Sequence, residues 1–376
     1  MFPVRRYDML KNYPPTNLNR DDTGAPKTCL FGGAMRGRIS SQCLKRSWRT
    51  SASLRAEIDD NNLGIRTRKL PVLVAEKLVE MGVSQEFADA VQPRLTGIGN
   101  KEGKETKDGN ATAQVIFYAK EDIIAVAETV KELLDNCKTV KDVQKLKAKD
   151  IQAAIPGADV RPVTLDIALF GRMVTSDAFR DVEASMQVAH AISTNKVSVE
   201  SDYFTAMDDM LSGESMDELG AAMIGDVDFN SSCYYVYASI DTDALAENLK
   251  YSDNSEEIIR KAIPALLRAM AFTDPSGKQN SFAGHVMPSV VMVECKEKKI
   301  PTSMVNAFVE PVGKGDLVKQ SADRLAKEVD MTARNFGLEV KERLWFCVDK
   351  YDIKPETATK VCTTFPELVE SVSASL

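Results

Sequence analysis

Apolar and polar residues alternate in a way that predicts three strands and two helices in the second half of the chain. Aromatic and β-branched residues favour a strand over 231–240 (SSCYYVYASI), and two more strands are predicted over 288–295 and 339–348. Apolar residues recur with helical spacing over 247–271 and 317–336. This order of strand, helix, strand, helix and strand predicts a small α+β sheet domain.

The N-terminal segment would add a first strand and a first helix to this domain. Residues 1–12 predict only a poor strand, because Pro3 and several charges interrupt it. Residues 14–26 predict a loop with a turn at Asp-Thr-Gly, and about 41–56 predict a helix. The N-terminal elements would therefore pack with strands that lie more than two hundred residues away in sequence.

The middle of the chain has a different character from the two ends. Residues 65–95 and 111–180 are mostly helical in pattern, and a polar loop over 97–104 separates them. Residues 212–230 are rich in Gly, Ser, Asp and Met, which is typical of an excursion from a core. The sequence thus predicts a helical insertion followed by a projecting segment.

Composition limits the classes of protein that fit the chain. With 376 residues, 44% hydrophobic and 27% charged, it can bury a sizeable core. Seven cysteines without a CxxC pair and two histidines argue against metal or triad chemistry, so we expect no metal and no cofactor. With no leader or membrane span in the sequence, we expect a cytoplasmic protein that does not contact membranes.

Charge is distributed unevenly along the chain. The net charge is −7, yet residues 1–50 hold ten basic and three acidic side chains. Five lysines fall within 138–149, whereas 197–249 contains no Lys or Arg and twelve acidic residues. A basic arm on an acidic body is typical of polyanion binding. The alternative is an ordinary solvated charged surface.

The segment from Asn17 to Arg49 carries the candidate binding chemistry. Gly32-Gly33 would let the backbone approach a ligand closely. Arg36 and Arg38 lie two apart, so an extended chain would point both to one face. Ser40 or Ser41 would cap the helix that follows.

That helix would present one basic face. Gln42, Lys45, Arg46 and Arg49 fall at i, i+3, i+4 and i+7. A capped helix N-terminus favours a phosphate, and fixed cations beside it would bind further backbone oxygens. The segment therefore predicts a surface that follows a phosphodiester backbone.

Several motifs resemble the CasC family, the repeated backbone subunits of the type I-E CRISPR Cascade. In the basic segment these are NLNRDD, FGG, RGRISSQ and LKRSWR, in this order and spacing. Further along they are DIALFGRM, QVAHAISTNKV, DYFTAMDD and SGKQNSFAGHVMP. The resemblance covers most of the chain and is weakest in the helical middle and the C-terminal tail.

The resemblance implies an RRM-like (ferredoxin-like) palm with a helical fingers insertion and a β-hairpin thumb. The palm would comprise 1–60, 181–195 and 229–376, the fingers 61–180 and the thumb 196–228. The family is non-catalytic, and its copies polymerise along the guide RNA (crRNA). The implied partners are crRNA, target DNA, further copies of the chain and other Cascade subunits.

The resemblance also implies roles for particular residues. RNA contacts are implied for Asn19, Arg20, Lys27, Arg36, Arg38, Ser40, Gln42, Lys45, Arg46, Arg49, Lys278, Gln279 and Asn280. A wedge that displaces a base is implied for Met173, Tyr203, Phe204 and Thr205. DNA contacts are implied for Lys138, Lys141, Lys145 and Lys149, which would share one helical face.

Each of these assignments has a structural alternative. Arg20 could pair with Asp21 or Asp22, and Arg36 or Arg38 with the acidic body. The 277–284 loop could be a plain turn. Met173 and Phe204 could be core residues, and the lysines a solvated surface.

Two other functions compete with the scaffold. In the first, a type III-like backbone subunit would cleave RNA, with Asp21 and Asp22 as metal ligands or general base. In the second, a generic RNA chaperone would stack bases on aromatic residues of the strand at 233–237. The first predicts cuts that depend on the two carboxylates, and the second leaves the FGG to LKR segment without a role.

Overall fold

The computed structural model describes residues 4–206 and 223–376 and divides into two compact units. The sheet unit comprises residues 1–54, 188–239 and 263–376, and the helical unit comprises 55–187 and 240–262. The helical unit thus takes in 181–187 and 240–262, which the sequence-based division groups with the palm. Residues 207–222 of the expected thumb lie outside the described residues.

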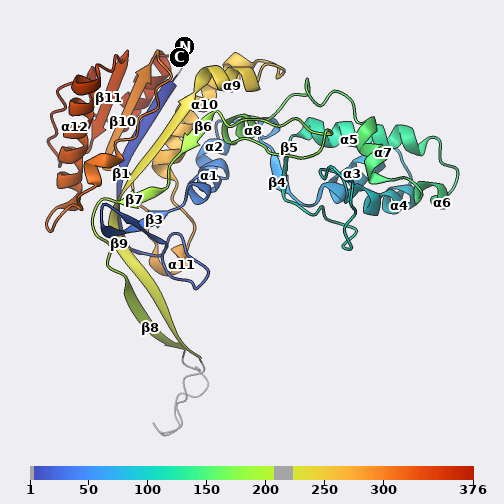
Figure 1. Cartoon of the computed structure of the whole chain (residues 1–376), viewed down its shortest axis with the longest axis horizontal. Coiled ribbons are helices and arrows are strands. Elements are labelled where there is room, and N and C mark those ends of the chain that lie inside the picture. Colours follow the sequence, from blue (N-terminus) through green and yellow to red (C-terminus); the bar gives the residue numbers. More distant parts are fainter. Residues whose placement is uncertain (1–3, 207–222) are drawn as a thin grey trace, which may run out of the picture. The chain divides into compact units, whose positions relative to one another are not determined.

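One mixed sheet organises the sheet unit (Figure 1). Its strand order is β12-β11-β10-β1-β9-β7-β3-β2, and β8 pairs with β9 outside this path. β1 and β11 run antiparallel to β10, whereas β12 runs parallel to β11. The strands are β1 (Val4–Thr16), β2 (Thr28–Phe31), β3 (Ala34–Ile39), β6 (Met186–Val188), β7 (Ala191–Ser193), β8 (Glu200–Ala206), β9 (Met223–Asp241), β10 (Val290–Lys296), β11 (Glu342–Cys347) and β12 (Lys360–Cys362).

The helices of the sheet unit are short except for α12. They are α1 (Ser41–Arg49), α2 (Ala52–Arg55), α11 (Gln279–Phe282), η3 (Val305–Phe308), α12 (Leu317–Phe336) and α13 (Phe365–Ala374), together with the C-terminal part of α10 (Ser255–Phe272). α12 and η3 cover one face of the sheet, where Tyr235, Phe308 and Trp345 are buried with aliphatic residues of α12. The predicted helix over 317–336 is confirmed with the same bounds.

Strand β1 differs most from the prediction. The sequence predicts a poor strand over 1–12 and a loop from residue 14, whereas the structure has one continuous strand over Val4–Thr16, so this prediction is wrong. β1 has 13 residues and lies between β10 and β9. Its charged residues Arg5, Arg6, Asp8 and Lys11 are at most 2% exposed. Distant partners compensate them, as when the Lys11 ammonium lies 2.8 Å from a carboxylate oxygen of Asp274. Buried charge is tolerated where it is paired and hydrogen-bonded.

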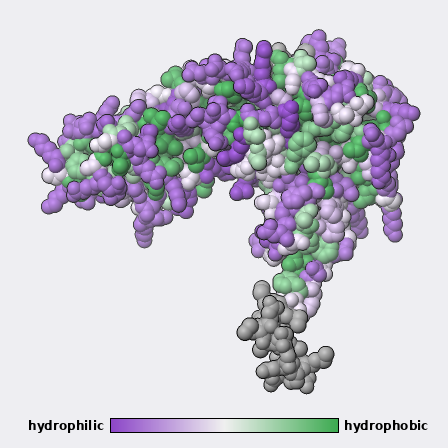
Figure 2. All heavy atoms as spheres, turned by 180° about the vertical axis from the view of Figure 1, so that it is seen from behind, coloured by the Kyte–Doolittle hydropathy of each residue, from purple (hydrophilic) through white to green (hydrophobic). Residues whose placement is uncertain are grey.

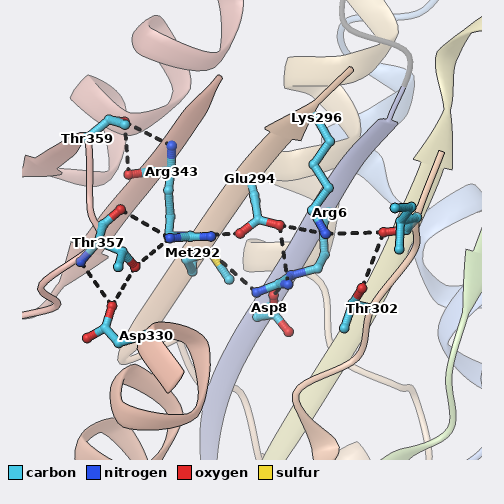
Figure 3. Close-up of polar contacts among 11 residues, drawn as sticks. Arg6, Asp8, Met292, Glu294, Lys296, Thr302, Asp330, Arg343, Thr357 and Thr359 are labelled. Atoms are coloured by element: carbon cyan, nitrogen blue, oxygen red, sulfur yellow. Dashed lines mark hydrogen bonds and ion pairs between the residues drawn. The ribbon is translucent and has the colours of Figure 1, made fainter. Parts of the chain in front are cut away.

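A buried charged cluster crosses three neighbouring strands of the sheet (Figure 3). The Glu294 carboxylate on β10 lies 3.3 Å from Arg6, 2.7 Å from Arg343 and 2.9 Å from Lys296. Arg6 also pairs with Asp8 at 2.7 Å, and the Tyr235 hydroxyl donates to the other Asp8 oxygen. The charges of β1 are therefore part of the core that joins the strands.

The helical unit contains η1 and the remaining helices, with a small two-stranded sheet. Its elements are η1 (Asp60–Asn62), β4 (Ile65–Thr67), α3 (Leu70–Glu80), α4 (Gln85–Leu95), β5 (Ile116–Tyr118), α5 (Lys120–Leu134), α6 (Val140–Val143), α7 (Ala148–Ala154), α8 (Leu165–Phe170) and α9 (Thr242–Asn248), and the first part of α10. The helical prediction is confirmed for most of 65–95 and 111–170, whereas 171–180 is not helical. Among the described residues, no helix combines the length and apolar character needed to cross a membrane.

Two other predicted helices are interrupted. The helix over 41–56 divides into α1 and α2 at Thr50 and Ser51, and that over 247–271 divides into α9 and α10. The Ser51 hydroxyl accepts from the amide of Leu54 at 3.1 Å, which favours a new helix start over continuation. The break leaves α1 as a separate nine-residue helix.

Candidate nucleic-acid interface

Helix α1 is held at its N-terminus by a side chain from the preceding loop. Ser40 is the N-cap, and its hydroxyl accepts from the Cys43 amide at 3.3 Å. The Asn19 side-chain oxygen accepts from the Ser40 amide at 2.9 Å. Leu44 and Trp48 are buried beneath the helix. Ser40 is itself buried, and the structure shows it as a cap; its direct RNA contact stays a prediction.

The opposite face of α1 carries the predicted cationic surface. Gln42 and Arg46 are exposed, and Lys45 and Arg49 are half-buried. Partial burial lowers the pKa of Lys45. Within residues 4–206 and 223–376, neither Lys45 nor Arg46 lies in an ion pair with a carboxylate. Their charges are thus available to an anion from solution.

A cleft of about 560 Å³ lies beside this face. Its walls are the loop 18–24, the α1 residues Cys43, Arg46 and Ser47, and the 276–277 turn. A Cβ at Gly277 would lie 2.3 Å from the Leu18 carbonyl oxygen, so the turn and the loop are in close contact. Arg20 is exposed at this cleft and forms no ion pair within the described residues. The structure therefore does not show the alternative in which Arg20 pairs with Asp21 or Asp22.

Asp21 stabilises the loop in which it lies. Its carboxylate accepts from the Thr23 amide at 2.9 Å, the Thr23 hydroxyl at 2.8 Å and the Ala25 amide at 3.0 Å. The Thr23 hydroxyl hydrogen bond is the main reason that the pKa of Asp21 is lowered. No group of three His, Cys, Asp or Glu side chains suited to a metal occurs among the described residues. The geometry therefore shows Asp21 as a turn former.

The environment of Arg36 differs from the predicted RNA contact. Its guanidinium is fully buried and donates to the carbonyls of Ser193 and Thr194, at 3.0 and 2.7 Å, and of Phe308 and Val309, at 2.7 and 3.1 Å. Four internal acceptors leave no room for a phosphate. The predicted RNA contact of Arg36 is wrong, because this side chain links β3 to the C-terminal ends of β7 and η3.

At Gly32-Gly33 the backbone is expected to approach a ligand closely, but Gly32 packs against Val309 of the same chain. Gly32 has φ +57°, and a Cβ on it would lie 1.8 Å from the Val309 carbonyl oxygen. Gly33 has φ +73° and open space around it. The close packing that glycine permits here is with the chain itself.

The two glycines provide a matched test of this packing. We expect Gly33→Ala to cost about 1 kcal/mol, the strain of a left-handed alanine. Gly32→Ala adds a steric clash, so we expect a loss of at least about 2 kcal/mol, since overpacking costs about 1–3 kcal/mol beyond that strain. Urea denaturation of both variants measures the difference, and equal losses would contradict the packing described.

Lys27 and Arg38 occupy adjacent positions beside the base of α1. The Arg38 amide donates to the Lys27 carbonyl at 2.8 Å, and its guanidinium Nε donates to the Thr28 carbonyl at 3.2 Å. A terminal nitrogen of Arg38 lies 3.0 Å from Nδ1 of His190. His190 is not among the residues predicted from the sequence, although it lies within the QVAHAISTNKV motif.

The 277–284 loop combines structural and exposed residues. Lys278 has φ +50°, and Gln279 donates from its amide nitrogen to the carbonyls of Pro275 and Gly284, at 2.9 and 3.3 Å. Gln279 therefore shapes the loop, as the structural alternative expects. Asn280 is exposed and Lys278 half-buried, so both stay predicted RNA contacts.

Strands β8 and β9 form the described part of the predicted thumb hairpin, which projects from the sheet (Figure 1). Tyr203 is 65% exposed, Phe204 is 37% exposed, and Thr205 is exposed. Adjacent strand residues point to opposite faces, so the two rings present separate surfaces. Met173 in the helical unit is 91% exposed. The alternative that Met173 and Phe204 are core residues is wrong.

The predicted DNA-binding lysines are all exposed, but they do not share one helix. Lys141 lies in α6 and Lys149 in α7, with Lys138 and Lys145 in the connecting segments. Lys145 pairs with Asp142 at 3.1 Å. Figure 2 shows hydrophilic residues predominating at the end of the helical unit that carries α6. The predicted shared helical face is wrong, because the four lysines are divided between α6, α7 and the connecting segments.

Comparison with known proteins assigns the chain to a family. The sequence profile described as "CT1975-like protein" matches residues 6–371. The chain is similar to a chain of a solved "CRISPR RNA-guided surveillance complex, pre-nicking", with 25% identity, 99% coverage of both chains and a TM-score of 0.81. A chain of a second "CRISPR RNA-guided surveillance complex" shares the fold, at 23% identity, 99% and 100% coverage and a TM-score of 0.71. No curated protein matches.

Proposed function

The chain belongs to the CT1975-like protein family, and from this premise we propose that it is a scaffold subunit that binds the guide RNA of a CRISPR surveillance complex. One observation carries the proposal: among the described residues, Lys45 and Arg46 of α1 form no ion pair with a carboxylate, and Arg46 lines an open cleft. Such a surface binds phosphates. The similarity to a chain of an RNA-guided surveillance complex supports the same ligand.

Binding through the RNA backbone suits this function because it leaves base edges free to pair with a target. Phosphate contacts position a nucleic acid without reading its sequence. In RNA-guided complexes the sequence is read by base pairing. The chain's contribution would be to hold the guide in a shape that pairs with target DNA.

The exposed apolar side chains have a separate role in the proposal. Tyr203 and Phe204 on the β8–β9 hairpin, together with Thr205, would displace a base of the guide, since aromatic rings stack on bases of any sequence. Met173 offers a further exposed apolar side chain for such a step.

The lysines on and around α6 and α7 would contact target DNA through its phosphates.

The proposal also covers the fold of the sheet unit, the type of complex and the absence of catalysis. The sheet unit would be an RRM-like palm, and the assembly a cytoplasmic type I-E Cascade in which copies of the chain polymerise along crRNA beside other subunits. The chain would be non-catalytic, which its use of Asp21 in a turn supports. Magnesium-dependent cuts at regular intervals in a target RNA annealed to the bound guide, lost in Asp21→Ala or Asp22→Ala, would favour the type III-like alternative instead.

Salt-dependent binding of single-stranded RNA tests the proposal. Each phosphate contact contributes about −0.7 to the slope of log K against log salt concentration. We expect Arg46→Gln to reduce the magnitude of that slope by about 0.7, and Lys319→Gln on α12 to leave it unchanged, although both remove one positive charge. Equal slopes for the two variants would contradict a binding site on α1.

A further inference from the structure

His190 lies next to the cations at the base of α1. It directly precedes β7, and β7 pairs with β3 so that Arg38 faces Ile192 and Ile39 faces Ala191. This register brings the imidazole to Arg38, with 3.0 Å between Nδ1 and a terminal guanidinium nitrogen. The imidazole is exposed, so its other edge is open to a ligand.

The contact defines the tautomer of His190. A guanidinium has only donors, so Nδ1 must be the unprotonated acceptor of this hydrogen bond. The proton of the neutral ring is then on Nε2, which has no hydrogen-bond acceptor among the described residues and can donate to a ligand. Burial lowers the pKa of His190, and the nearby positive charges of Arg38 and Lys27 lower it further, in keeping with a neutral ring.

The same contact orients Arg38 without neutralising it. Arg38 is held by the Thr28 carbonyl through Nε and by His190 through a terminal nitrogen. Neither partner is a carboxylate, and among the described residues no carboxylate forms an ion pair with Arg38 or Lys27. A fixed arginine that keeps its full charge is suited to an anionic ligand.

We propose that His190 is both a positioning and a contact residue for RNA: Nδ1 orients Arg38, and Nε2–H donates to a phosphate oxygen of the bound strand. This inference rests on the proposed function. It extends the RNA surface from α1 across Lys27 and Arg38 to the start of β7.

Three substitutions of His190 separate positioning from charge. His190→Ala removes both hydrogen bonds, and we expect single-stranded RNA to bind about 10-fold more weakly. His190→Gln keeps an acceptor for Arg38 and a donor for RNA, so its affinity should stay within about threefold of wild type. His190→Lys adds charge but repels Arg38, so it should bind more weakly than wild type; tighter binding by His190→Lys would overturn the positioning role.

A double-mutant cycle and a reference variant complete the test. If His190 acts through Arg38, His190→Ala has a smaller effect in an Arg38→Ala background than alone. Equal effects in both backgrounds would overturn the coupling. If Arg46→Gln weakens RNA binding and His190→Ala does not, this inference alone fails; if neither does, the proposed function fails. Thermal unfolding of the single His190 variants should match wild type, because the imidazole is exposed.

Discussion

Replacing Lys45 and Arg46 together by glutamine is expected to weaken single-stranded RNA binding by a factor of about 100 to 10,000. A hydrogen bond to a charged group contributes about 1.5–3 kcal/mol, and about 1.4 kcal/mol corresponds to a factor of ten. Both cations lie on one face of α1 and have no carboxylate partner in the part of the chain that the structure describes, so each is available for a phosphate. Fluorescence anisotropy with a labelled RNA at physiological ionic strength measures the loss.

The matched control removes two charges elsewhere in the same unit. Lys319 and Lys327 lie on the solvent-accessible side of α12, which covers a face of the sheet. Lys319→Gln/Lys327→Gln changes the net charge by the same amount, and we expect an effect of less than about threefold because the long-range field is screened over about 8 Å. Equal losses for the two double variants would mean that RNA responds only to total charge.

Glu294→Gln is expected to lower the free energy of unfolding by about 3–5 kcal/mol. The carboxylate is buried among the cations of Arg6, Lys296 and Arg343, and removing one partner of a buried charge pair carries a cost of this size. The matched surface variant is Glu257→Gln, whose partner Lys261 lies at 2.6 Å on an exposed face of α10. There we expect about 0–1 kcal/mol. Urea denaturation compares the two, and similar losses would contradict a structural role for the cluster.

The same carboxylate makes stability depend on pH. Despite its burial, the neighbouring cations lower the pKa of Glu294 from 4.5 to about 2 in the folded chain. The unfolded chain therefore binds more protons between these values, and the stability that Glu294 contributes is present above about pH 4.5 and lost as the pH falls toward 2. The shift corresponds to about 3 kcal/mol. The stability difference between wild type and Glu294→Gln should shrink in this window.

Asp8 changes stability with pH in the opposite direction to Glu294. The pH dependence of the wild type must therefore be compared with that of Glu294→Gln. Burial raises the pKa of Asp8, so its own contribution falls as the pH rises through that value. Acid unfolding of the wild type alone would mix the two carboxyl groups. Subtracting the variant's curve from that of the wild type gives the contribution of Glu294 together with its coupling to Asp8. A difference that is constant from pH 6 to pH 3 would contradict the lowered pKa of Glu294.

The sequence predicts those helices and strands whose buried residues recur with the spacing of the element itself. The helix at 317–336 and the strand within β9 are such cases, since their buried faces are mostly apolar, although Ser321 and Asp330 of the helix are buried as well. β1 is different because its buried charges depend on distant partners: Ser375 for Arg5, Glu294 for Arg6 and Tyr235 for Asp8. No local rule reveals that a charged strand will find compensating charges hundreds of residues away.

The candidate site shows the same division. The cap at Ser40 and the shared face of Lys45 and Arg46 depend only on residues within one helical turn or two, and the sequence predicted both. Arg36 and Arg38 are alike in sequence, yet one bonds to internal carbonyls and the other to His190. Their difference arises from β3–β7 pairing and from the 308–309 segment, which spacing alone could not predict.

The most direct test of guide-RNA binding is a nuclease-accessibility footprint on a long single-stranded guide-like RNA. We expect protection interrupted at a constant interval, because each bound copy would hold the backbone on α1 and displace a base with its hairpin. In Phe204→Ala the protection should remain and the interruptions should disappear. Uniform protection by the wild type, or no protection at all, would contradict a repeating scaffold that binds guide RNA in this way.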